Sequence, residues 1–185
     1  MKAIKLLLLF SLMLNVFLFI LVINYETKKE EISYSILYNE MNDVYDLYKM
    51  ILKQLEIEEG SAATNGVLYK TEKEKIPYYG LLLDINRTTN KINLLSTLAG
   101  ELQIDSLFGY FTVSKTTVLN QIQQDLLSSM LKNEPLKVTE EAKEKIKAEI
   151  ESLQKLVSYL QNKDYMHRSA MEQRKILQNF SDLKE

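Results

Sequence analysis

The sequence predicts an all-α protein, in which an N-terminal transmembrane signal-anchor helix precedes an antiparallel bundle of four to five helices. Three observations predict this fold. One apolar segment near the N-terminus is long enough to span a bilayer. Elsewhere, apolar residues recur at alternating spacings of three and four, which is the period of a helical seam. Glycine and proline are rare, at 5 and 2 of 185 residues, so few positions interrupt a helix.

The apolar segment covers residues 6–24 and is the strongest signal in the chain. Its core, Leu6 to Ile23, is interrupted only by Ser11 and Asn15. As a helix it would be roughly 27 Å long, close to the thickness of the hydrocarbon layer. A cleaved signal peptide has a shorter apolar region and small residues before the cut. This segment is longer and lacks such small residues. We therefore expect an uncleaved anchor; a helical protein secreted after cleavage is the weaker alternative.

The lysines around the span bear on its orientation. Two lysines lie before the span and two lie close after it, so the positive-inside rule is evenly balanced. The short leader, residues 1–5, favours a cytoplasmic N-terminus. Residues 25–185 are then an extracytoplasmic domain on a cell membrane. The chain has no cysteine, so this domain folds without disulfides, as in many bacterial envelope proteins.

The first helix of the domain is predicted from about Thr27 to Glu58, with a seam of three heptads. The seam consists of Tyr34, Leu37, Met41, Val44, Tyr48, Ile51 and Leu55. Gly60 should end this helix, and a loop is expected at about 60–77. Asn65-Gly66 is a strong turn signal, so a minor β-hairpin near residues 62–69 is an additional expectation.

The middle of the chain is predicted as two helices separated by a loop. Apolar spacing predicts a helix over about Tyr78 to Gln103. A loop follows at about 104–114, within which the aromatic run from Phe108 to Val113 is expected as a loop or a short strand. The next helix should start after Ser114, a suitable N-cap, and stop before the next proline.

The C-terminal part is predicted as two further helices after a loop at about 133–139. Thr139 is a suitable N-cap for the first of them. The apolar seam of this helix changes phase beyond Leu160, which predicts a break near Asn162-Lys163. Asp164 is then the expected cap of the last helix. The alternative is a single long helix with a local irregularity.

The sequence offers no catalytic, cofactor-binding or metal-binding set, and we expect a protein that is not an enzyme and has no cofactor. There is no cysteine nucleophile, and the one histidine, His167, cannot form a multi-histidine metal site. We expect His167 to be exposed. A glycine-rich phosphate loop is missing from the sequence. The net charge of −2, without a basic stripe, also disfavours a nucleic-acid partner.

Aromatic residues provide the two candidate sites. Four tyrosines of the first predicted helix lie on one helical face: Tyr34, Tyr38, Tyr45 and Tyr48. They predict either a core-facing stripe with its hydroxyls at the rim of the bundle, or a surface that binds a partner. Phe108, Tyr110 and Phe111 are candidates for the lining of a pocket between helices.

The sequence therefore favours a single-pass envelope protein whose extracytoplasmic bundle mediates protein–protein interaction, as an accessory, assembly or protective factor. Its expected partners are the lipid bilayer, through residues 6–24, and another membrane or envelope protein or a second copy of itself. The alternative is a ligand-sensing helical module. With one span and a short leader, such a module would act through a membrane partner.

Overall fold

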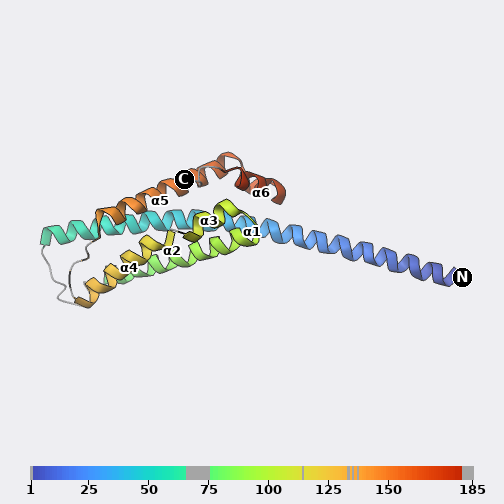
Figure 1. Cartoon of the computed structure of the whole chain (residues 1–185), viewed down its shortest axis with the longest axis horizontal. Coiled ribbons are helices and arrows are strands. Elements are labelled where there is room, and N and C mark those ends of the chain that lie inside the picture. The colour runs from blue at the N-terminus through green and yellow to red at the C-terminus, as the bar shows by residue number, and fades with distance from the viewer. Residues whose placement is uncertain are drawn as a thin grey trace.

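The computed structural model describes residues 2–65, 76–113, 115–132, 134, 136 and 138–180. Within these residues the chain is helical and contains no strand, which confirms the all-α prediction for the described part. The helices are α1 (Lys2–Asn65), α2 (Ile76–Glu101), α3 (Asp105–Val113), α4 (Lys115–Lys132), α5 (Glu140–Asn162), the 3₁₀ helix η2 (Tyr165–His167) and α6 (Ala170–Gln178) (Figure 1).

Helix α1 is an unbroken helix of 64 residues, roughly 96 Å long. Its first half projects away from the other helices as a rod (Figure 1). From Tyr34 onward, one face of α1 packs against α2, α5 and α6. We call residues 2–33 the rod, and the remainder of α1 together with α2–α6 the helical body.

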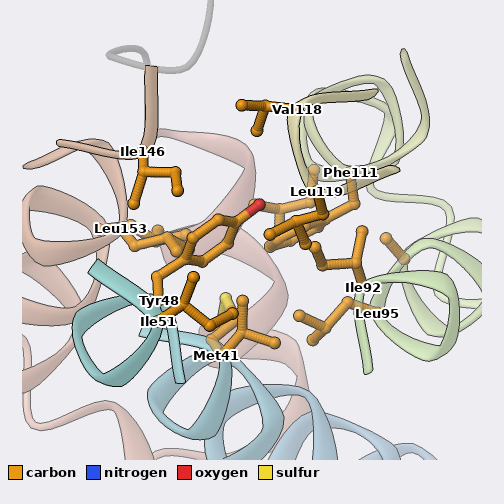
Figure 2. Close-up of a cluster of buried hydrophobic side chains, with 14 of the residues drawn as sticks. Met41, Tyr48, Ile51, Ile92, Leu95, Phe111, Val118, Leu119, Ile146 and Leu153 are labelled. Carbon is orange, nitrogen blue, oxygen red and sulfur yellow. The ribbon is translucent and has the colours of Figure 1, made fainter. Parts of the chain in front are cut away.

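The helical body has one continuous apolar core. All seven residues of the predicted α1 seam are buried, from Tyr34 to Leu55. They pack with buried residues of the other helices, and Figure 2 shows the middle of this cluster, where α1, α2, α3, α4 and α5 meet. Full burial of a large apolar side chain stabilises a fold by about 1.5–3 kcal/mol. Burial of these seams therefore holds the helices together.

Polar contacts at the rim fix α1 and α2 in antiparallel order. The Lys91 ammonium of α2 pairs with Glu40 and, at 2.9 Å, with Asp43 of α1. Further along the pair, the Gln54 amide donates to Asp84 at 3.1 Å. Residue numbers thus rise on one helix as they fall on the other.

Two helix boundaries are as the sequence predicts. Helix α4 begins at Lys115 and ends at Lys132, ahead of the proline. Helix α5 begins at Glu140, and its N-cap is Thr139, whose hydroxyl accepts a hydrogen bond from the Ala142 amide at 3.2 Å.

The predicted end of the first helix is wrong. Helix α1 passes through Gly60 and continues to Asn65, so residues 62–65 of the expected hairpin are helical. Residues 66–69 lie outside the described part of the chain. One glycine costs a helix only about 1 kcal/mol relative to alanine, and Ala62 and Ala63 have the highest helix propensity.

The loop or strand expected at 104–114 is also wrong, because this segment contains α3. Leu107 and Phe111, four residues apart, are buried in the core together with Ile104. That spacing suits a helix, and packing here overrides the strand preference of aromatic residues. The turn from α2 into α3 is tight, with Gln103 in the left-handed region at φ 56°.

The break predicted near Asn162-Lys163 is confirmed, since α5 ends at Asn162. The predicted cap is wrong. Asp164 lies at φ 51°, before η2, and caps nothing with its side chain. Ser169 is the N-cap of α6, in a capping box with Glu172, whose carboxylate accepts hydrogen bonds from the Ser169 hydroxyl and amide at 2.8 and 3.1 Å.

Candidate functional site

The four tyrosines of α1 divide between the core and its rim. Tyr34 and Tyr48 are buried, whereas Tyr38 and Tyr45 are partly exposed. The Tyr38 ring stacks on Tyr165, which follows α5, with 5.7 Å between ring centroids. Part of this tyrosine face therefore packs within the chain. A partner surface at Tyr38 and Tyr45 stays a prediction.

The structure brings Tyr48 close to the aromatic residues of α3. The Tyr48 ring extends toward Phe111 and Leu119 (Figure 2), and the Tyr110 and Phe111 rings meet edge to face at 4.9 Å. Burial raises the pKa of Tyr48 and of Tyr110, and the Glu149 carboxylate raises both further. These phenols are therefore neutral at physiological pH and act as packing groups with polar tips.

Phe108 lies in a different environment from its two predicted pocket partners. Its side chain is 44% exposed, while Phe111 is buried in the core. Three surface hollows of the described chain lie on α2, where the rod leaves the helical body, and between α5 and α6. All three are lined by other residues. Phe108 instead lies beside Gly100 of α2, where it covers the α2–α3 turn.

The outer face of α2 combines exposed apolar side chains with fixed charges. Tyr79, Leu83 and Leu94 are 50%, 67% and 41% exposed. Leu83 and Leu94 border a hollow of about 430 Å³, together with Lys91 of α2 and Glu40 of α1. The sequence prediction considered only the buried seam of this helix. A second set of apolar residues at Tyr79, Leu83 and Leu94 was the signal that could have identified the face.

Lys91 fixes the charge pattern of this face. Partial burial lowers the pKa of its ammonium, but hydrogen bonds to Glu40 and Asp43 raise it, and the net pKa is raised. The ammonium therefore stays charged and keeps both carboxylates in place. An ordered pattern of charges beside exposed leucines is typical of protein-binding surfaces.

A second hollow, of about 540 Å³, lies where the rod leaves the helical body. Its walls carry both signs of charge, with Glu26, Lys29 and Glu30 on α1 and Arg174 on α6. The Arg174 guanidinium donates to the Gln103 side chain at 3.3 Å, which joins α6 to the α2–α3 turn. We call this hollow the junction hollow. The last hollow, about 310 Å³, lies between α5 and α6.

His167 is exposed, as expected, and its side chain is 81% accessible. Its Nδ1 lies 2.6 Å from an Asp164 carboxylate oxygen. This is one local pair of neighbours in sequence. In the described part of the chain, no group of three or more histidine, aspartate or glutamate side chains is arranged to hold a metal ion.

The rod carries the most exposed apolar surface of the described chain. The large apolar side chains from Phe10 to Ile23 are each 47–69% exposed, and none of them packs on the helical body. Among the described helices, α1 is the one long and apolar enough, by length and composition, to cross a membrane. No protein-family model, curated protein or solved structure matches the chain.

Proposed function

We propose that this protein is a single-pass membrane protein that holds its helical body outside the cytoplasm, where the body binds other proteins in an accessory, assembly or protective role. Residues 6–24 would cross the bilayer with the N-terminus in the cytoplasm. Tyr25 would then lie at the membrane–water interface, a position that suits its amphipathic ring.

One observation carries the membrane part of the proposal. The core of the helical body begins at Tyr34 and is complete without the rod, because no side chain from Phe10 to Ile23 is buried. A helix that is apolar on all sides and unburied needs an apolar surrounding. A bilayer supplies it over the whole length of the segment.

The protein-binding part of the proposal depends on the outer face of α2. Exposed leucines beside a fixed Lys91 ion pair provide both apolar contact area and a charge pattern that a partner must match. The two leucines and Lys91 lie on α2, and the carboxylates that pair with Lys91 lie on α1. We therefore expect Leu83 and Leu94 to lie within the contact with the partner.

The test uses full-length protein in its native membranes. After an alkaline carbonate wash, the chain should stay in the membrane pellet, whereas a Leu14→Lys, Leu18→Lys variant should not. Each lysine near the middle of a span costs about 2.5–3.5 kcal/mol of insertion free energy. The control Leu14→Ile, Leu18→Ile keeps the span apolar and should stay in the pellet.

Partner binding is measured in the same membranes by chemical cross-linking. Leu83→Glu, Leu94→Glu should abolish the cross-linked product, whereas Met171→Glu, at a residue of α6 that is 81% exposed, should preserve it. Wild-type chain in the soluble fraction would refute the membrane assignment. Equal cross-linking of the wild type and the double α2 variant would refute the role of α2.

A further inference from the structure

Helix α1 carries a second helical stripe of exposed residues, outside its buried seam. Its members are separated alternately by four and three residues, and each is exposed. The outer stripe consists of Ser11, Asn15, Leu18, Val22, Tyr25, Lys29, Ile32 and Ile36. It runs without interruption from the apolar segment into the part of α1 that joins the helical body.

Helix geometry places the C-terminal end of this stripe away from Tyr34, the first residue of the buried seam. At 100° per residue, Ile32 and Ile36 lie roughly 160° from Tyr34 in either direction around the helix. Tyr34 is buried against the helical body, while Ile32 and Ile36 are 60% and 40% exposed. Helix α1 can therefore pack on its own chain with one face and on another helix with the other.

Asn15 indicates which helix packs on the outer stripe. It lies on this stripe, near the middle of the apolar segment, and is exposed. An amide surrounded by hydrocarbon is costly unless it is hydrogen-bonded, and asparagine side chains bond across neighbouring membrane helices. The Asn15 amide offers both a donor and an acceptor. A second copy of the same helix, inserted in the same direction, supplies a matching amide at the same depth.

The residue types of the outer stripe specify the geometry. In heptad terms, Asn15, Val22, Lys29 and Ile36 occupy a positions, and Ser11, Leu18, Tyr25 and Ile32 occupy d positions. β-Branched residues at a with leucine at d favour two parallel strands, and one asparagine at an a position fixes the register. The membrane part of the stripe, with Asn15 and Val22 at a positions and Leu18 at a d position, thus has the pattern of a two-stranded parallel coiled coil.

Charge sets the limits of this seam. Lys29 occupies an a position, and it also lines the junction hollow together with Glu26 and Glu30. Beyond Ile36 the same positions become acidic, at Asp43 and Asp46. Asp43 already pairs with Lys91 of α2 in its own chain, so the seam should end near Ile36, roughly 38 Å from Ser11.

We propose that two copies of this protein associate in parallel through the outer stripe of α1, from Ser11 to Ile36, with the Asn15 amides hydrogen-bonded to each other. The inference depends on the membrane span of the proposed function. It leaves the outer face of α2 free for a different partner.

Cysteine cross-linking tests the proposal on the full-length, cysteine-free chain in its membranes. Tyr25→Cys and Ile32→Cys place a thiol on the outer stripe. The matched controls Thr27→Cys and Glu31→Cys lie at similar depth and are also exposed, but they point away from the outer stripe. Mild oxidation should give disulfide-linked dimers at positions 25 and 32, and little at 27 and 31.

The amide contact is tested by Asn15→Leu in the Tyr25→Cys chain, with Met13→Leu, a substitution off the stripe, as its control. Loss of one hydrogen bond between membrane helices should weaken association by about threefold to thirtyfold, and Met13→Leu should not. If the chain stays in the carbonate-washed pellet, equal cross-linking at all four positions, or cross-linking at none of them, would overturn the proposed dimer but not the membrane span. A chain that leaves the pellet would overturn the membrane span as well.

Discussion

Tyr48 shows what a single aromatic residue contributes to this protein. It lies in the buried seam of α1, and its ring reaches toward Phe111 and Leu119 (Figure 2). The sequence placed Tyr48 on a face shared with three other tyrosines, but it could not separate core from surface. That distinction depends on α3 and α5, which reach Tyr48 only through tertiary packing. The approach of Tyr48 to Phe111 was therefore beyond the sequence prediction.

Ionisation of the buried phenols should destabilise the fold at alkaline pH. Burial raises the pKa of Tyr48, Tyr110 and Tyr165 above the ordinary value. The folded state then holds protons that the unfolded state releases. Their stabilising contribution is complete below the unfolded pKa of about 10 and is lost as pH rises above it.

Tyrosinate absorbance measures this effect. In the native protein, Tyr48→Phe should leave the titration curve unchanged until helical circular dichroism is lost. In urea, the same substitution should lower the amplitude by one of the 11 tyrosines. A smaller amplitude for Tyr48→Phe while the helices are intact would show that Tyr48 ionises in the folded state.

Individual helices were predictable where their signals are local. The seams of α1 and α2 and the start of α5 follow from spacing and from an N-cap residue, because both act within a few turns of one helix. The end of α1 and the whole of α3 were not predictable in this way. At Gly60 a helix breaker was overridden, and around Phe111 burial decided between strand and helix.

The N-cap of α5 gives an element-scale prediction. Thr139→Ala removes the hydroxyl that accepts from the Ala142 amide and should lower the free energy of unfolding by about 1 kcal/mol. Thr97→Ala, at an exposed position inside α2, should change it by less than about 0.5 kcal/mol. Urea denaturation followed by circular dichroism measures both. Equal effects of the two substitutions would rule out a capping role for Thr139.

At the scale of the whole molecule, the sequence indicated an apolar helix and a helical domain, and direct continuation of one into the other was an open alternative that the structure shows as one helix. Helix α1 belongs to both, as a continuous helix that is exposed from Phe10 to Ile32 and packed from Tyr34 onward (Figure 1). Membrane insertion and association with a second copy would therefore both involve α1. The outer face of α2 and the outer stripe of α1 became visible only when the other side chains were in place.

The central claim is that α1 crosses a membrane with the helical body outside the cytoplasm. The chain has no cysteine of its own, so one thiol can be placed on either side of the span, in Lys2→Cys and in Thr27→Cys. On intact cells, a membrane-impermeant maleimide should label Thr27→Cys at once, and Lys2→Cys only after the membrane is disrupted. Labelling of Lys2→Cys on intact cells, or of neither thiol until lysis, would contradict the account.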